Sequence, residues 1–366
     1  MTSGEIAFAV PGKITNLTGG TIYDRRVIDA LPALGIKVRH IELPGSFPNP
    51  PAADMRRTLD LLSSVPADIP LVVDGLAFGA LDTGEVAKLR APLFPLVHHP
   101  LAEETGISEV DRQRLFETER DNLGHARHVL VPSPHTAGLL TAKYDVPQAA
   151  ISIARPGTDR PTLTAAPATP PLILAVGIQL PRKGHDVLLK ALSHIDDLEW
   201  SAVIAGAPLD PGYAEELRTL NRRLGLEARV TLAGQIERSA LEGLYAKASV
   251  FALATRYEGY GIVFDEALAH GLPIVSCATG AVPDTVPQDA GLLTAPDTPE
   301  DFARALRRML TEPDLRRASA AAARAAGLSL PSWTDTAAQV AAVLRRHQVV
   351  PPNEPANATG SCRNDP

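Results

Sequence analysis

The chain has 366 residues, of which 45% are hydrophobic and 21% charged, and its formal net charge at pH 7 is −7. This length suits two domains of average size, each with its own hydrophobic core, in a globular protein. The negative net charge argues against a general nucleic-acid-binding protein. The two cysteines, Cys277 and Cys362, lie far apart and in no metal-like spacing, which argues against a zinc site or a disulfide framework.

The apolar segments show no sign of a membrane protein. The first residues lack the basic region and the long apolar run of a signal peptide. Further along, Gly, Pro or His interrupts each apolar stretch before it reaches the length of a bilayer span. We therefore expect a cytoplasmic protein whose association with membranes is at most peripheral.

Strand-like and helix-like segments alternate along the first half of the chain. Short apolar runs predict strands at residues 6–10, 37–42, 71–74, 93–97 and 128–131. Apolar residues at helical spacing predict helices between them, including residues 22–34, 110–123 and 135–143. This alternation indicates an α/β protein built around parallel sheets.

A second set of such segments follows a break in the pattern. Residues 154–171 are rich in Pro, Thr and Ala, which is typical of a linker. Strands are then predicted at residues 172–176, 202–205, 230–232, 250–253 and 274–276, and a last helix at 333–346. The tail from Val349 is rich in Pro and Asn and poor in apolar residues, which predicts disorder.

Residues 256–273 carry the strongest functional signal. Glu258 and Glu266 lie eight residues apart and flank Gly259 and Gly261, between a predicted strand and a predicted helix. Free backbone N–H groups and the positive end of the helix dipole then point at whatever lies over the turn, usually an anion such as phosphate. A phosphate site with a carboxylate at each end suits a nucleotide-sugar, which carries hydroxyls on both sides of its diphosphate.

This segment resembles the Glu-x7-Glu signature of glycosyltransferase family 4, the retaining nucleotide-sugar transferases with the GT-B fold. Pro156-Gly157-x-Asp159 is similar to the linker motif of the family, and Trp333 fits its terminal helix. The resemblance implies two Rossmann-like domains that face each other across a cleft. The expected parts are an acceptor-side domain (1–155), a nucleotide-sugar-binding domain (156–330), a helix that crosses back to the first domain (331–348) and a disordered tail (349–366).

A second motif runs from Gly177 to Asp186 and carries Arg182 and Lys183 just before a predicted helix. Two adjacent cations at a helix start oppose the helix dipole, so the arrangement favours a bound anion. By resemblance, Lys183 matches the lysine of the phosphate-binding Lys-Gly motif of the family. Many members have arginine directly after the first glycine, where this chain has Ile178, so we assign the guanidinium role to Arg182.

The pair His98-His99 follows the strand predicted at residues 93–97 and precedes Pro100. It resembles the family's His-x-Pro segment, whose histidine faces the donor sugar, and we prefer His98 over His99 for that role. No further Cys or His cluster accompanies the pair. Since the resemblance also implies catalysis without a bound metal, we expect no metal and no other cofactor.

Two glycine loops are also similar to the family's loops. Gly19-Gly20 follows the first strand and resembles the loop that approaches the donor phosphates and the acceptor. Gly234-Gln235 follows the strand predicted at 230–232 and resembles the loop that meets the nucleobase through backbone groups.

The resemblance assigns a role to each of these groups. The side chains of Arg182 and Lys183 and the N–H groups after Gly261 would bind the charge that grows on the leaving diphosphate. Glu266 would bind ribose hydroxyls and Glu258 hydroxyls of the transferred sugar, so the two carboxylates are binding groups rather than the acid/base pair of a glycosidase. The predicted catalytic residues are His98, Glu258, Arg182 and Lys183. The predicted substrate-binding residues are Gly19, Gly20, Gly234, Gln235, Gly259, Tyr260, Gly261, Ile262, Val263 and Glu266.

Other classes with Rossmann-like units fit less well. A nicotinamide dehydrogenase needs Gly-x-Gly-x-x-Gly, but Phe264 stands where the third glycine should be. A P-loop NTPase is excluded because Gly12-Lys13 is followed by Ile14. The alternatives still open are an epimerase or phosphorylase of the GT-B type and a non-catalytic protein that binds nucleotide-sugars. The sequence also leaves open the donor's base and sugar, and whether the acceptor is a glycan, a lipid or a small molecule.

Overall fold

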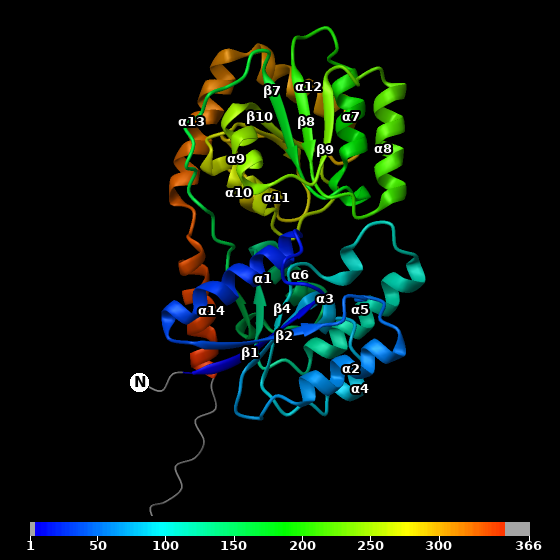
Figure 1. Ribbon diagram of the computed structural model, residues 1–366, viewed down its shortest axis with the longest axis vertical. Helices are drawn as coiled ribbons and strands as arrows, with labels where there is room; N and C mark the ends of the chain where they lie inside the picture. Colours follow the sequence, from blue (N-terminus) through cyan, green and yellow to red (C-terminus); the bar gives the residue numbers. More distant parts are fainter. Residues whose placement is uncertain (1–3, 348–366) are drawn as a thin grey trace, which may run out of the picture.

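The computed structural model of the chain describes residues 4–347. They form two α/β units, each with a six-stranded parallel sheet between helices (Figure 1). The tail predicted to be disordered, 349–366, lies outside the described residues, as does residue 348 of the predicted terminal segment. No described helix has both the length and the hydropathy of a membrane span.

The first sheet has the strand order β2-β1-β3-β4-β5-β6, with all neighbours parallel. Its strands are β1 (Glu5–Pro11), β2 (Lys37–Leu43), β3 (Leu71–Asp74), β4 (Leu93–Leu96), β5 (Val129–Val131) and β6 (Ile151–Ile153). The helices and 3-10 turns of this unit are α1 (Gly19–Ala30), η1 (Leu31–Leu34), α2 (Ala52–Ser63), α3 (Gly75–Phe78), α4 (Thr83–Val86), η2 (Leu101–Glu103), α5 (Glu109–Leu123), α6 (Pro134–Lys143) and η3 (Gln148–Ala150).

The second sheet has the order β12-β11-β10-β7-β8-β9, again all parallel. Its strands are β7 (Leu172–Val176), β8 (Ser201–Ala205), β9 (Val230–Gly234), β10 (Ala248–Leu253), β11 (Ile274–Cys277) and β12 (Gly291–Thr294). The helical elements are η4 (Pro181–Lys183), α7 (His185–Ser193), α8 (Pro211–Arg223), α9 (Arg238–Lys247), α10 (Ile262–Ala269), α11 (Val282–Thr285), α12 (Pro299–Thr311), α13 (Pro313–Ser329) and α14 (Trp333–His347).

Each sheet has a topological switch point, where the chain stops adding strands on one side and starts on the other. In the first sheet it lies between β1 and β3, and in the second between β7 and β10. Loops at the carboxyl ends of the two strands diverge there, which opens a crevice in which doubly wound folds bind their ligands. The predicted site loops after β1, β7 and β10 lie at these two points, whereas His98 follows β4, next to β3, and Gly234-Gln235 lies at the end of β9.

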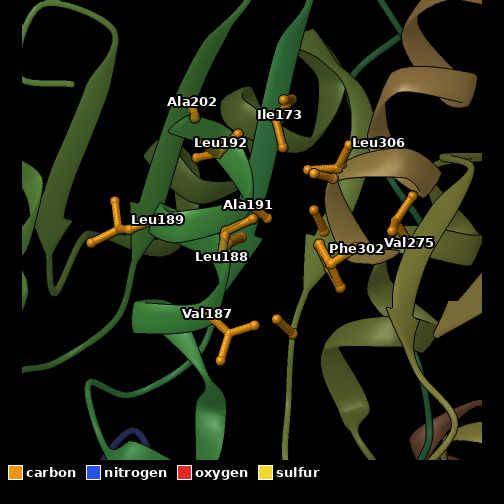
Figure 2. Packing of buried hydrophobic residues seen from close by; sticks show 14 of the residues in the cluster. Ile173, Val187, Leu188, Leu189, Ala191, Leu192, Ala202, Val275, Phe302 and Leu306 are labelled. Atoms are coloured by element: carbon orange, nitrogen blue, oxygen red, sulfur yellow. The ribbon is translucent and has the colours of Figure 1, made fainter. Parts of the chain in front are cut away.

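The central strands are apolar on both faces because both faces are covered by helices. In β1, Ile6, Phe8 and Val10 pack in one cluster and Ala7 and Ala9 in the cluster on the other face, which is the two-residue alternation of a strand. Figure 2 shows the equivalent packing in the second unit, where Leu188 and Leu192 of α7 and Phe302 and Leu306 of α12 lie in one cluster with Ile173 of β7.

Helix α14 belongs to the core of the first unit although it follows the second in sequence. Its residues Ala337, Val340 and Leu344 are buried in the same cluster as Phe8 and Val27, and α14 lies beside α1 in Figure 1. Its start is close to the linker, because a Cβ on Gly157 would lie 2.2 Å from the Trp333 nitrogen. Glycine is therefore needed where linker and helix meet.

Glu119 of α5 is a buried carboxyl group that should make stability depend on pH. Its side chain accepts a hydrogen bond from the Leu101 N–H at 2.8 Å, and burial raises its pKa from 4.5 to about 8. Between these two values the folded state binds more protons than the unfolded state, so the free energy of unfolding falls as pH rises. Glu119→Gln removes this titration while keeping the shape and the acceptor.

We therefore expect the wild-type protein to lose stability relative to Glu119→Gln when the pH is raised from 5 to 8.5, on the order of a few kcal/mol. Urea unfolding of both proteins at the two pH values measures the difference. An equal change in both proteins would contradict this assignment, because every other titrating group is common to them.

Candidate functional site

The centre of the candidate site is a buried carboxylate paired with two cations. Glu258, in the loop after β10, is 4% exposed. Its carboxylate lies 2.6 Å from Lys183 Nζ and 3.7 Å from Arg182 Nη1, and Thr255 Oγ1 donates to it at 3.1 Å. Burial disfavours the charged form, but the two cations outweigh it and hold the pKa of Glu258 below its usual value. The β7 and β10 loops thus place Glu258, Arg182 and Lys183 together at the switch point.

The position of the two cations follows from Gly184. Arg182 and Lys183 lie in the 3-10 turn η4, and α7 begins only at His185, so the cations precede the helix rather than occupy its first turn. Gly184 has φ +63°, and a Cβ there would lie 1.9 Å from the Ala254 carbonyl oxygen. Only glycine lets the η4 turn lie directly on the end of β10.

The turn before α10 has the geometry of an anion-binding site. Gly261 is the N-cap of α10 with φ +89°, and no side chain caps the helix. Within residues 4–347, the N–H groups of Gly261, Ile262 and Val263 have no hydrogen-bond acceptor. A Cβ on Gly261 would lie 3.7 Å from Glu258, so these N–H groups are near the Glu258 cluster. Such a helix start favours a phosphate.

Two neighbours in this turn face the protein interior. The Tyr260 hydroxyl donates to the buried Asp265 at 2.5 Å, so only its backbone can face a ligand. Gly259 meets the first unit: a Cβ there would lie 2.2 Å from the His98 carbonyl oxygen, and Ser133 Oγ donates to the Gly259 carbonyl at 2.6 Å. At Gly259, a predicted substrate-binding residue, the missing side chain makes room for the other domain.

His98 lies at the switch point of the first sheet, between two carboxylates. Its Nε2 is 3.0 Å from Asp24 Oδ1 of α1 and 3.4 Å from Asp74 Oδ2 at the end of β3. Burial disfavours a charged ring, but the two carboxylates outweigh it and raise the pKa of His98 to about 10. Burial and the neighbouring Asp74 in turn raise the pKa of Asp24 to about 8, so His98, Asp24 and Asp74 titrate as one coupled group. A Cβ on Gly20 would lie 2.9 Å from the ring, so the glycine loop makes room for His98.

Neither Asp24 nor Asp74 is among the site residues predicted from the sequence. Asp74 could have been found, because it ends a short apolar strand that neighbours β1. The carboxyl ends of neighbouring parallel strands lie side by side, so a polar residue there is a candidate site residue. The ligand atoms of Asp24, Asp74 and His98 all lie within 4.8 Å of one another, close enough to hold a metal ion as well as a proton.

His99 and Glu104 connect the first unit to Arg182. Glu104 Oε1 lies 3.0 Å from Arg182 Nε, and Glu104 Oε2 lies 3.4 Å from His99 Nε2. Glu104 is partly buried, yet its contacts with His99 and Arg182 lower its pKa to about 2. The guanidinium predicted to bind phosphate is therefore paired with carboxylates of both domains, Glu104 and Glu258.

The remaining predicted residues lie around this centre. Glu266, in the second turn of α10, accepts from Arg238 and Tyr245. Gly19 starts α1, whose N-cap is Thr18, and a Cβ there would meet nothing within 4 Å. Gly234 has φ +63° and its carbonyl accepts from Gly206 N–H at 2.7 Å, while Gln235 is exposed. The binding roles of these residues stay predictions.

Comparison with known proteins identifies the second unit. Residues 162–326 match the family model of glycosyl transferases group 1. These residues are a group 1 glycosyltransferase domain. The matched range contains both Glu258 and Glu266 and the Arg182-Lys183 pair, so all the second-unit site residues belong to this domain.

The chain is also similar to proteins over a longer range. The D-inositol 3-phosphate glycosyltransferase of Mycobacterium avium is 30% identical over 285 residues, which cover 76% of this chain and 64% of that protein. The enzyme of the same name from Xylanimonas cellulosilytica is 35% identical over 173 residues, 47% of this chain and 41% of that protein. The chain thus spans less than two thirds of the length of these relatives.

Solved structures confirm the predicted GT-B fold. Sucrose-phosphate synthase from Thermosynechococcus elongatus superposes with a TM-score of 0.76 at 23% identity, covering 93% of this chain and 98% of that one. Anabaena HepE, solved in complex with UDP, superposes with a TM-score of 0.73 at 17% identity, covering 93% of this chain and 100% of that one.

Proposed function

We propose that this protein is a retaining glycosyltransferase of family 4 that acts in the cytoplasm. It would move a hexose from a nucleoside-diphosphate-sugar to an acceptor hydroxyl. The observation that carries the proposal is the meeting of Lys183, Arg182 and the unpaired N–H groups of the α10 start around Glu258, at the switch point of a group 1 glycosyltransferase domain. Cations and N–H groups arranged in this way bind a leaving diphosphate better as its charge grows.

The arrangement of Glu258 supports retention without a protein nucleophile. One of its oxygens is engaged by Lys183 and Thr255, and Arg182 lies near the other. A carboxylate held by ion pairs with a lowered pKa is a weak nucleophile and a weak base, but it still accepts hydrogen bonds from sugar hydroxyls. The acceptor oxygen would then attack from the same face as the departing diphosphate.

We propose that the reaction needs no metal ion. Lys183 and Arg182 supply the cations for the phosphates. The His98 group also has spacing that a metal could use, so the point needs a direct test. Activity should be the same in EDTA and in added Mn²⁺. Activity that disappears with EDTA and returns with Mn²⁺ would contradict this proposal, and its loss in Asp74→Asn would then point to the Asp24–His98–Asp74 group as the metal site.

The donor can be found by thermal shift with UDP, GDP, ADP and TDP. A nucleotide at a hundred times its dissociation constant should add about 2.7 kcal/mol to the free energy of unfolding. UDP is the first choice because HepE was solved with it, and D-inositol 3-phosphate is the first acceptor to test because relatives are named for it. The product's anomeric configuration, read by NMR, tests retention.

The thermal-shift screen, followed by an assay of the bound nucleotide-sugar, separates a glycosyltransferase from a binding protein and from an epimerase. Binding of a nucleotide with neither transfer nor hydrolysis of its sugar would indicate a non-catalytic nucleotide-sugar-binding protein. An altered sugar still attached to its nucleotide would indicate an epimerase. A chain that none of the four nucleotides stabilises would contradict the donor site itself.

A further inference from the structure

Both oxygens of the Glu266 carboxylate are held by side chains that no predicted motif includes. Arg238 Nη1, at the start of α9, donates to Glu266 Oε1 at 2.5 Å. The Tyr245 hydroxyl, in the last turn of the same helix, donates to Glu266 Oε2 at 2.9 Å. Helix α9 therefore holds the carboxylate of α10 at both of its oxygens.

Tyr245 is held by burial, whereas Arg238 is 60% exposed and held by two carboxylates. Tyr245 is 2% exposed and its ring stacks on His270 with a centroid distance of 5.0 Å and an interplanar angle of 13°. The second terminal nitrogen of Arg238 lies 3.4 Å from Asp159 in the linker. Asp159 also pairs with Arg26 of α1. The Arg238 guanidinium thus spans from Glu266 to a carboxylate that the first domain holds in place.

This geometry leaves the carboxylate able to bind a diol. An ionised carboxylate accepts about four hydrogen bonds, two on each oxygen. Arg238 and Tyr245 use one position on each oxygen, which leaves one on each for two adjacent hydroxyls. The Glu266 side chain is still 15% exposed, so it is not closed off from a ligand. A carboxylate fixed in this way loses little side-chain entropy when a diol binds.

We propose that Arg238, assisted by Tyr245, is a positioning residue that aims Glu266 at the 2′- and 3′-hydroxyls of the donor ribose. Through Glu266 it sets a preference for ribonucleotides over 2′-deoxyribonucleotides. The proposal rests on the function proposed above, in which Glu266 faces the ribose. Arg238 acts only through Glu266 and contacts none of the reacting atoms.

Calorimetric titration with UDP and 2′-deoxy-UDP tests the proposal, or with GDP and 2′-deoxy-GDP if the thermal screen selects guanine. The wild-type protein should bind the ribonucleotide about tenfold or more tightly, as expected for a hydrogen bond to a charged group. Arg238→Leu should weaken ribonucleotide binding about tenfold and deoxyribonucleotide binding less than about threefold. The ratio of the two dissociation constants should therefore approach one.

Conservative variants and a matched control sharpen the result. Arg238→Lys should restore part of the preference, because it keeps the charge but only one donor reaches Glu266. Tyr245→Phe should lower the preference without disturbing the stack on His270. Arg222→Leu removes an exposed arginine of α8 that pairs with Glu215 at 3.4 Å, and it should leave both dissociation constants unchanged.

Glu266→Gln separates this proposal from the proposed function. If Glu266→Gln keeps the ribose preference, Glu266 does not face the ribose, and both the donor-site assignment and the role of Arg238 are wrong. If Glu266→Gln loses the preference but Arg238→Leu keeps it, only the role of Arg238 is wrong. Support requires that both variants lose the preference and that Arg238→Leu adds no further loss in the Glu266→Gln background.

Discussion

Lys183→Ala is expected to lower kcat by on the order of a hundredfold or more. The Lys183 ammonium lies 2.6 Å from Glu258, and its side chain is only 12% exposed. A cation with so little solvent around it stabilises the charge on a departing diphosphate more strongly than a surface lysine could. Because this charge grows in the transition state, the loss should appear in kcat rather than only in KM. Steady-state kinetics with the donor found by thermal shift measure both constants.

The same substitution is expected to reduce stability, because it leaves the Glu258 carboxylate buried with only Arg182 nearby. Breaking a buried ion pair from one side costs about 3–5 kcal/mol. The double variant Lys183→Met with Glu258→Gln removes the unpaired charge, so it should recover most of that stability but not the activity.

The kinetic control is Arg223→Ala, on the surface of α8, which should leave kcat and KM unchanged. Wild-type kcat in Lys183→Ala would remove this residue from the site.

The sequence predicts the central strands and the edge strands β2 and β9, but it misses the other two edge strands. Ten of the twelve strands begin and end within two residues of the predicted runs, because buried parallel strands are short and continuously apolar. The strands that were missed are β6 and β12, which lie at the outer edges of the two sheets. Ile151-Ser152-Ile153 and Gly291–Thr294 are both short and only partly buried, so their sequences carry a weaker apolar signal than the seven-residue strand β2.

The helix predicted at residues 22–34 shows a similar limit. The structure divides it into α1, which starts at Gly19 with Thr18 as its N-cap, and the 3-10 turn η1. Pro32 lies in η1, and proline cannot donate the hydrogen bond that would continue an α-helix. Thr18 and Pro32 are both visible in the sequence, but a helix prediction based on apolar spacing alone takes no account of them.

The second-domain half of the site was predictable because its residues are adjacent in sequence. Glu258, Gly261 and Glu266 form one motif, and Arg182-Lys183 forms another. The first-domain half depends on pairs that only the fold brings together. Asp24 is 74 residues from His98, and Glu104 is 78 residues from Arg182. The residues around an acidic side chain do not indicate which distant cation it will pair with. The pairings of Asp24 and Glu104 could therefore not be predicted without the structure.

Gly259→Ala is expected to reduce kcat/KM by about a hundredfold while the domains stay folded. A Cβ at this position would lie 2.2 Å from the His98 carbonyl oxygen and 2.8 Å from His99 Cβ. Because these atoms belong to the other domain, the added methyl group must push the two domains apart or displace the loop that carries Glu258. A displacement of about 1 Å in an active site can cost a hundredfold in rate. Gly259 lies in the loop between β10 and α10, outside both sheets, so each domain should stay folded in circular dichroism.

The matched control is Gly243→Ala in α9, where a Cβ would meet nothing within 4 Å. Replacing glycine with alanine inside a helix should raise stability by about 0.5–1 kcal/mol and leave kinetics alone. Nucleotide affinity separates the two ways in which Gly259→Ala can act. If the domains part, the second domain still binds the nucleotide with near wild-type affinity, whereas a displaced Glu258 loop weakens binding as well. Wild-type kcat/KM in Gly259→Ala would contradict the expectation, because it would mean that turnover does not use the contact between Gly259 and His98.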